Sequence, residues 1–270
     1  MTPFPYRDFH AASSLARGVE RYRPAAKVTA ADRKARTDPG KRYGAGEYDL
    51  RLPASPTCSA VTLDAALDAR RSTRSFADRP VPFEQLGAVL GTYRCSGELD
   101  VPGGPLALRT AASAGGLYPI EVYPAATRVT GLPAGVYHYR PTDRALAATR
   151  RDAGDIASAL ESLVLDPGQA KGAAGALILT ARFGRSVDKY GERGYRYALI
   201  EAGEVVQTLA LGAAATGIGL VCHGAFYDGP ANQLLGIDGL AESVLAILLF
   251  GALEENSKGG NQAAESAPRR

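Results

Sequence analysis

The sequence is poor in the features that define several large classes of protein. It has three cysteines, Cys58, Cys95 and Cys222, which lie far apart and are odd in number. They predict neither a disulfide framework nor a zinc site. No apolar run reaches the ~20 residues of a membrane-spanning helix, and the N-terminal MTPFPYRDFHAASS has no apolar core typical of a signal peptide. We therefore expect a cytoplasmic protein that is not embedded in a membrane.

Charge and short motifs exclude further classes. The net charge of +3 at pH 7 is too small to indicate nucleic-acid binding, and basic and aromatic residues do not alternate as in a base-stacking surface. The histidines His10, His138 and His223 lack metal-ligand spacing. The dinucleotide fingerprint G-x-G-x-x-G and the P-loop are both absent. The sequence predicts no metal site and no nucleic-acid partner, and a nucleotide-like ligand would have to be held in another way.

Composition divides the chain into three parts. Residues 1–55 are basic and contain Pro and Gly with little apolar periodicity, which predicts an extended arm. The charges of this arm are either simply solvated or contact an acidic partner. Residues 253–270 are polar and rich in small residues, which predicts a disordered tail. A globular domain is expected over residues 56–252.

Helical and strand patterns mix in this domain without a regular β-α-β order, which predicts an α+β fold. The expected helices are residues 63–71 capped by Thr62, 83–94, 154–165 capped by Asp152, 195–216, and 230–236 opened by Asp228. The expected strands are residues 120–129, a hairpin over 135–150, 175–184, a short strand or loop at 219–226, and 243–251. The last strand is apolar without alternation, so we expect it to be central in a sheet.

The helix expected over residues 195–216 is apolar on nearly every side, which indicates burial on several faces. Its exceptions, Glu201, Glu204 and Thr208, form one stripe. The cover could come from a subunit interface in a homodimer or from a central position inside a monomer. The pattern does not choose between these two explanations.

An arginine-rich segment follows the first expected helix. It contains Arg70, Arg71, Ser72 and Arg74. Guanidinium groups and a hydroxyl suit the binding of a phosphate. Arginines at the end of a helix also simply complement the helix dipole.

A Gly-rich segment, SAGG at residues 113–116, precedes the first long strand. Small residues let the backbone approach a planar ligand closely and point N–H groups at it. An ordinary glycine turn before a strand has the same composition.

A lysine and a tyrosine, Lys189 and Tyr190, stand directly before the long apolar helix. On their own they are explained by a solvated lysine beside a packed tyrosine. His223, in VCHGAF, is by itself more typical of a hydrogen-bonded structural histidine than of a catalyst.

Taken in order, these segments resemble one family. RRSTRSF, SAGGLYPIEVYP, GVYHYRPTDRAL and KYGERGYRYALIEAGEVVQTLALGAAATGIGL, with the closing apolar strand, are similar to the SagB-type dehydrogenases, the azoline-oxidising branch of the nitroreductase superfamily. FHAASS resembles the entry segment of that branch. The resemblance covers nearly the whole chain except the tail. It implies an FMN enzyme with a mostly antiparallel sheet flanked by helices, in an intertwined homodimer with FMN at the dimer interface.

The resemblance also implies roles for individual residues. The phosphate and ribityl chain of FMN would be held by Arg70, Arg71, Ser72 and Arg74. The isoalloxazine ring would lie beside Ser113, Ala114 and Gly115, with Gln207 and the backbone of His223, Gly224 and Ala225 on its other side. Lys189 and Tyr190 match the catalytic Lys-Tyr pair of this branch.

The chain departs from the family pattern at two places. Glu204 and Thr208 stand where relatives often have AGH followed by QN, so a flavin contact from these positions is not expected. Many nitroreductases carry a basic phosphate ligand soon after the final strand, whereas here Gly251 is followed by ALEEN. The arginines near residue 70 would then have to hold the phosphate alone.

The implied activity is oxidation of a thiazoline or oxazoline to a thiazole or oxazole, with oxygen reoxidising the flavin. The substrate would be a modified peptide or a carrier-tethered group, a cyclodehydratase could be a partner, and the basic arm could contact an acidic leader peptide. Lys189 can act as the base only in its neutral form, which Arg193 and Arg196 would favour, and Tyr190 could stabilise a developing oxyanion. Two alternatives remain: an NAD(P)H-dependent nitro or quinone reductase, and a non-catalytic scaffold subunit of a peptide-modifying complex.

Overall fold

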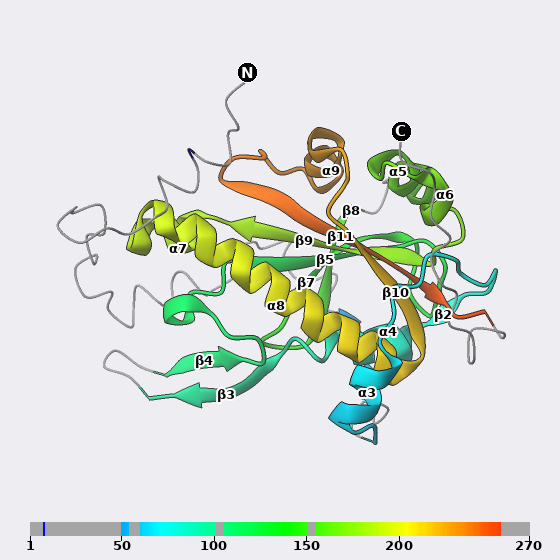
Figure 1. Ribbon diagram of the computed structural model, residues 1–270, viewed down its shortest axis with the longest axis horizontal. Helices are drawn as coiled ribbons and strands as arrows, with labels where there is room; N and C mark the ends of the chain where they lie inside the picture. Colours follow the sequence, from blue (N-terminus) through cyan, green and yellow to red (C-terminus); the bar gives the residue numbers. More distant parts are fainter. Residues whose placement is uncertain (1–7, 9–49, 54–59, 101–104, 151–154, 255–270) are drawn as a thin grey trace.

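A seven-stranded antiparallel sheet forms the centre of the protein (Figure 1). The computed structural model describes residues 8, 50–53, 60–100, 105–150 and 155–254. The strands, in their order across the sheet, are β1 (Leu50–Arg51), β8 (Ala145–Arg150), β7 (Gly135–Arg140), β5 (Ile120–Ala126), β9 (Gly175–Arg182), β11 (Glu242–Ala252) and β10 (Ile218–His223). The predicted α+β class and mostly antiparallel sheet are therefore confirmed.

The strands with the longest apolar runs occupy the middle of the sheet. β11 pairs with β9 on one side and with β10 on the other, as its unbroken apolar run predicted. Such runs belong to strands with both faces covered, because no side of the strand has to meet water. The hairpin expected over residues 135–150 is also present, since β7 and β8 pair antiparallel from Arg140 and Ala145 outward.

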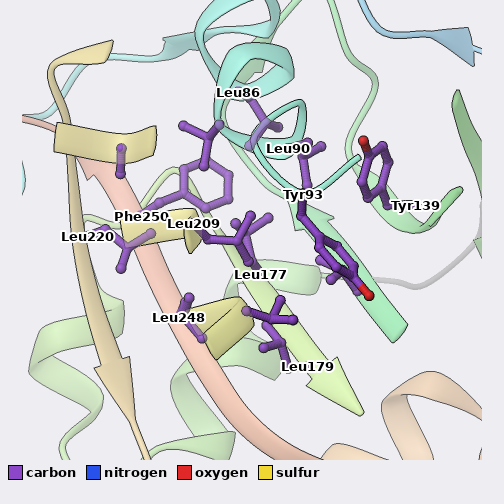
Figure 2. Close-up of a cluster of buried hydrophobic side chains, with 14 of the residues drawn as sticks. Leu86, Leu90, Tyr93, Tyr139, Leu177, Leu179, Leu209, Leu220, Leu248 and Phe250 are labelled. Carbon is purple, nitrogen blue, oxygen red and sulfur yellow. The ribbon is translucent and has the colours of Figure 1, made fainter. Parts of the chain in front are cut away.

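Helices cover both faces of the sheet (Figure 1). α3 (Leu63–Ala69), α4 (Phe83–Leu90) and α8 (Glu192–Thr216) lie on one side, and α5 (Ile156–Leu163), α6 (Pro167–Ala170) and α9 (Asp228–Leu235) on the other. Alternate residues of the central strands serve the two cores. Leu177 and Leu248 point to the α4 and α8 side with Leu209 (Figure 2), and Ile178 and Ile247 point to the α5 and α9 side.

Side chains mark where two helices begin. Thr62 caps α3 as expected, with Ala65 N donating to Thr62 Oγ1 at 3.2 Å. The expected cap of α5 was wrong. Asp152 lies outside the described residues, and α5 begins at Ile156 with Asp155 as its cap, because Asp155 directly precedes the first helical residue and accepts from Ser158 N at 3.1 Å.

α8 is the long apolar helix, and it begins three residues earlier than the sequence predicted. By length and composition alone it is the one helix among the described residues that could span a membrane. Its inner face packs on the sheet through Ala198, Val205 and Leu209. On the outer face Leu199 is 38% and Ile200 is 55% exposed. The helix is therefore not enclosed within the single chain.

Several smaller elements were not predicted. They are the hairpin of β3 (Cys95–Leu99) and β4 (Leu106–Arg109), which extends away from the main sheet (Figure 1), the pair β2 (Val81–Pro82) and β6 (Val129–Thr130), the turn η1 (Ala114–Gly116), and the helix α7 (Gly184–Tyr190). Two of these, η1 and α7, carry candidate site residues. The helix expected over residues 83–94 ends at Leu90, and the strand expected over 120–129 ends at Ala126.

Candidate functional site

The Gly-rich segment forms a tight loop between β4 and β5. Gly115 and Gly116 have φ values of 67° and 64°, and Tyr118 has φ 45°. The loop folds back on itself, because Tyr118 N donates to Ser113 Oγ at 2.8 Å. A Cβ added at Gly115 would lie 2.5 Å from both Lys189 Nζ and Tyr190 Oη. This position therefore requires glycine, and it brings the loop directly against the Lys-Tyr pair.

Lys189 and Tyr190 are the last two residues of α7. Gly191, with φ 57°, ends α7 and lets the chain turn into α8. Lys189 Nζ lies 4.9 Å from the centre of the Tyr190 ring, and that ring meets Tyr197 edge-on at 5.1 Å. Both side chains are half-buried. The pair is thus held side by side at a corner between two helices.

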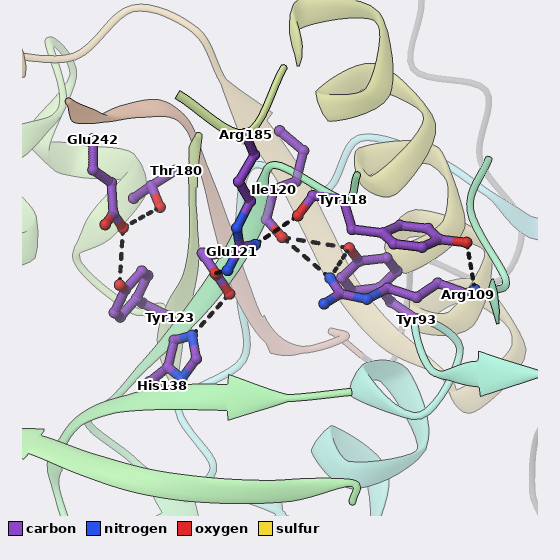
Figure 3. Close-up of polar contacts among 10 residues, drawn as sticks. All are labelled: Tyr93, Arg109, Tyr118, Ile120, Glu121, Tyr123, His138, Thr180, Arg185 and Glu242. Atoms are coloured by element: carbon purple, nitrogen blue, oxygen red, sulfur yellow. Dashed lines mark hydrogen bonds and ion pairs between the residues drawn. The ribbon is translucent and has the colours of Figure 1, made fainter. Parts of the chain in front are cut away.

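A buried ionic chain ties α7 to the Gly-rich loop (Figure 3). Arg185 Nη1 donates to Tyr118 O at 2.7 Å, and its Nη2 pairs with Glu121 Oε1 at 2.9 Å. Glu121 Oε2 lies 2.9 Å from His138 Nε2. Burial alone would raise the pKa of Glu121, but the hydrogen bond to His138 and the charge of Arg185 outweigh it and hold this pKa at about 2. The carboxylate is therefore a fixed charge that orients Arg185.

Arg109, at the end of β4, supports the loop from its other side (Figure 3). Its backbone N–H donates to Tyr118 Oη at 2.9 Å, and its Nη1 donates to Tyr93 Oη at 2.7 Å. The guanidinium also lies over the Tyr118 ring, 4.8 Å from its centre. Burial raises the pKa of Tyr93 to about 12 despite the nearby charge of Arg109, so this phenol stays neutral. The conformation of Tyr118 is thus fixed at its carbonyl, its ring and its hydroxyl.

Glu201 is a buried carboxyl group on α8. The residue is only 3% exposed, and its Oε1 is buried without a hydrogen-bond partner among the described residues. Burial raises the pKa of Glu201 to about 7, against the lowering effects of Ser113 and Arg109. The sequence showed Glu201 only as part of a polar stripe. Glu201 is buried whereas Glu204, in the same stripe, is exposed, and the sequence pattern did not distinguish the two.

The arginine-rich segment runs beside β10. Ser72 forms a parallel bridge with Leu220, and Thr73 N donates to Leu220 O at 3.0 Å. This pairing carries Arg74 toward His223 at the end of β10. Burial first, and then the charge of Arg74, lower the pKa of His223. His223 Nε2 is buried without a hydrogen-bond partner among the described residues.

The remaining candidate residues of the arginine-rich segment and of the segment after β10 differ in exposure. Arg71 is exposed and donates to its neighbour's carbonyl at 2.8 Å, while Arg70 is half-buried at the C-cap of α3, where it also suits the helix dipole. Gly224 and Ala225 are exposed, and a Cβ added at Gly224 would meet no heavy atom within 4 Å. Glu254, which follows β11, accepts from Ser75 Oγ at 2.6 Å. The segment that follows β11 thus presents an acid, Glu254, rather than a basic group.

The structure therefore brings the predicted residues together in two clusters. The first is Ser113, Ala114 and Gly115 with Lys189 and Tyr190, and the second is Arg70, Arg71, Ser72 and Arg74 with His223, Gly224 and Ala225. β9 leads into α7 at the start of β11, where Arg182 pairs with Glu242, whereas Ser72 lies beside Leu220, opposite Phe250 near the end of β11, and His223 lies opposite Ile247 between the two. Gln207 is exposed on the outer side of α8. Among the described residues, no group of His, Cys, Asp and Glu is placed to hold a metal ion.

Comparison with known proteins assigns this arrangement to a class of enzyme. Residues 67–252 match the description "Nitroreductase family", whose members are flavin-dependent oxidoreductases. The chain belongs to the nitroreductase family. It is 31% identical over 182 residues to "Putative nitroreductase MJ1384" of Methanocaldococcus jannaschii, an alignment that covers 67% of this chain and 88% of that relative. The resemblance inferred from the sequence is confirmed at the level of the family and the fold.

Two solved structures extend the comparison. A nitroreductase-type protein of Anabaena variabilis superposes with a TM-score of 0.58 at 30% identity, covering 62% of this chain and 34% of that protein, so the chain spans about a third of it. A chain of the E. coli microcin synthetase McbBCD complex, with truncated pro-MccB17 bound, superposes with a TM-score of 0.60 at 21% identity, covering 93% of this chain and 92% of that one. The second likeness is one of fold.

Proposed function

We propose that the protein is an FMN-dependent dehydrogenase that oxidises a peptide-bound or carrier-bound thiazoline or oxazoline to the thiazole or oxazole. The observation that carries this proposal is the meeting of Lys189 Nζ and Tyr190 Oη at Gly115. A base and a hydroxyl donor side by side suit removal of a proton next to a carbonyl. The similar fold of a chain in the microcin synthetase complex, which has a peptide precursor bound, supports a peptide substrate.

The residues of both clusters fit an FMN molecule. Arg74, with Arg70, Arg71 and Ser72 near it, supplies cationic and hydroxyl donors for the phosphate. Open backbone at Gly224 and the exposed glycine turn at Gly115 leave room for a flat ring to approach the main chain. The buried, unpartnered Nε2 of His223 adds a polar atom to this region. These residues would hold the cofactor without the basic residue that often follows the last strand.

The reaction removes one proton and one hydride from the azoline ring. Bound FMN would supply the hydride acceptor, with oxygen as the final oxidant. Lys189 would take the proton from the ring carbon that lies between the imine and the carbonyl. Tyr190 donates a hydrogen bond to the oxygen on which negative charge develops. The α7–α8 corner and the Gly-rich loop keep these two groups in position, so that little reorganisation is needed.

The outer face of α8 supports a homodimer. Leu199 and Ile200 are exposed there, and α3, which packs against α8, adds the exposed side chains of Leu63 and Leu67. Large apolar side chains gathered on one face commonly mark a protein interface. We propose that a second copy of the chain covers this face, with FMN bound near the interface. A cytoplasmic location and a cyclodehydratase partner are part of the same proposal, without a nucleic-acid partner or membrane insertion.

The decisive test is direct turnover. Purified protein loaded with FMN is incubated with an azoline-containing peptide, and mass spectrometry follows the loss of two hydrogen atoms. Lys189→Ala should lower the rate by about 100-fold or more, the usual contribution of a general base, while FMN stays bound. The matched control is Lys171→Ala, which removes an exposed lysine at the end of α6. Normal turnover by Lys189→Ala would reject the assigned base.

The second candidate is an NAD(P)H-dependent nitro or quinone reductase, which the name of the M. jannaschii relative favours. Such an enzyme needs the flavin but has no use for a base at Lys189. Oxidation of NADPH with a nitroarene, unaffected by Lys189→Ala and without azoline turnover, would favour this candidate. Measurable azoline oxidation or nitroarene reduction would exclude a non-catalytic scaffold.

A further inference from the structure

The corner between α7 and α8 is built by direct contact of their backbones. The chain turns at Gly191, and the first turn of α8 lies against α7 (Figure 1). A Cβ added at Gly194 would lie 2.5 Å from both the carbonyl carbon and the carbonyl oxygen of Ser186, and 2.7 Å from Val187 N. No side chain fits in that space, so glycine is required there. The start of α8 is therefore fixed closely against the helix that carries the Lys-Tyr pair.

Tyr197 lies one turn after Gly194 on α8, and its ring reaches back to the candidate site. The rings of Tyr197 and Tyr190 meet edge-on, with 5.1 Å between their centres and 88° between their planes. Aromatic rings favour this arrangement, because the positive edge of one ring faces the negative π surface of the other. Both side chains are half-buried, so part of the contact is shielded from water. The contact restricts where the Tyr190 ring can lie.

Arg193 gives Tyr197 a support on its own helix. Its guanidinium carbon lies 5.7 Å from the centre of the Tyr197 ring. Residues four apart on a helix are neighbours on its surface, and a cation is attracted to the face of an aromatic ring. Lys189 Nζ lies in turn 4.9 Å from the centre of the Tyr190 ring. Two rings thus stand in a row between two cations, in the order Arg193, Tyr197, Tyr190 and Lys189.

We propose that Tyr197 is a positioning residue of the candidate site: its ring keeps the Tyr190 side chain in the rotamer that brings the Tyr190 hydroxyl to Gly115. That hydroxyl and Lys189 Nζ both lie 2.5 Å from the point where a Gly115 Cβ would stand. A different χ1 rotamer would carry the hydroxyl, at the far end of the ring, away from the loop. Tyr197 acts only through Tyr190. The importance of this position for catalysis rests on the proposed function, whereas the position itself depends on contacts within the protein.

Nuclear Overhauser contacts measure this position without any substrate. The protein is used as purified, with isotope label in glycine and tyrosine only, and the signal followed is the cross-peak between Gly115 Hα and the Tyr190 ring protons. Tyr197→Leu should lose this cross-peak. Tyr197→Phe should keep it, because the edge contact needs the ring and not the hydroxyl. The matched control Tyr195→Leu removes another half-buried ring of α8, which stacks on Phe183 at 4.8 Å, and should also keep it.

Turnover separates positioning from simple stability. Tyr197→Leu should lower kcat for the azoline by roughly 10-fold, as expected when a catalytic donor is misplaced. KM should stay close to the wild-type value, because the lost interaction is made only in the transition state. Tyr197→Phe should restore kcat, and Tyr195→Leu should retain it. In a Tyr190→Phe background, where the hydroxyl is already absent, Tyr197→Leu should lower kcat no further.

Two outcomes would overturn the proposal. One is a cross-peak between Gly115 and Tyr190 that is as strong in Tyr197→Leu as in the wild type. If that variant does not fold, Tyr197→Met takes its place, because methionine fills an irregular space without a ring. The other is an equal loss of kcat from Tyr197→Leu with and without the Tyr190 hydroxyl. Absence of azoline turnover in the wild type would contradict the proposed function, whereas the cross-peaks would still decide the role of Tyr197.

Discussion

At the scale of single residues, Gly115 contributes most to the candidate site. Its φ of 67° is a conformation that side chains rarely adopt, and the space its Cβ would need is taken by Lys189 Nζ and Tyr190 Oη. The backbone conformation and the lack of space for a Cβ each require glycine at this position. The absence of a side chain is therefore what lets the loop approach Lys189 and Tyr190.

This predicts the effect of Gly115→Ala. The added methyl should push Lys189 and Tyr190 out of place and strain the turn, costing about 1–2 kcal/mol of stability and lowering azoline turnover by at least roughly 10-fold. The control is Gly229→Ala on α9, where no heavy atom lies within 4 Å of the added carbon. Urea unfolding and turnover assays check both variants. Full activity in Gly115→Ala would mean that the close contact does not matter to the reaction.

At the scale of elements, α7 depends on a contact far away in the sequence. Its side chain Arg185 reaches the carbonyl of Tyr118 and the carboxylate of Glu121, and all three groups are buried. The helix that carries Lys189 and Tyr190 is thereby tied to the loop that they face. An ionic tie of this kind is costly to break from one side, because the remaining charge stays buried and unpaired.

Arg185→Met should therefore lower the free energy of unfolding by about 3 kcal/mol, the cost of removing one of the two close partners of the buried Glu121 carboxylate while His138 remains. Arg94→Met, which removes an exposed arginine, should cost no more than about 0.5 kcal/mol. Adding Glu121→Gln to Arg185→Met should recover part of the loss, since the unpaired charge is then removed. Denaturant unfolding gives all three values. Equal stability of Arg185→Met and Arg94→Met would show that the ion pair contributes nothing.

The same elements show how far sequence patterns reach. The helix α8, the strand β11 and the hairpin of β7 and β8 were predictable because their apolar periodicity reflects burial directly. The segment GRSVDKY has no such pattern, and α7 forms where Arg185 finds distant partners. The candidate site shows the same difference between residues that a local pattern predicts and residues that depend on distant contacts. Local composition and family resemblance indicated the loop and the Lys-Tyr pair, whereas Arg185 acts through tertiary contacts with Tyr118 and Glu121 that no local pattern encodes.

At the scale of the whole molecule, apolar side chains on the outer side of α8 and on α3 are exposed in the part of the chain that the structure describes. Leu199 and Ile200 of α8 are exposed, and on α3, which packs against α8, Leu63 and Leu67 are 65% and 47% exposed. The helix that forms this face has its other side in the main core. A second copy covering it would add apolar burial to α8 and would place the two candidate sites of a dimer near the interface.

Ile200→Asp should therefore dissociate the proposed dimer, because a charge at the centre of an apolar interface has no partner there. The dimer dissociation constant should rise roughly 30-fold or more, as expected for a central interface residue. FMN affinity should fall with it if the cofactor lies between subunits. Leu240→Asp is the control, since Leu240 is 84% exposed on the turn before β11 and belongs to neither α3 nor α8. Sedimentation measured across protein concentrations, with and without FMN, distinguishes the outcomes: a wild type that is monomeric throughout contradicts the dimer, and an Ile200→Asp dimer as tight as the wild type places its interface elsewhere.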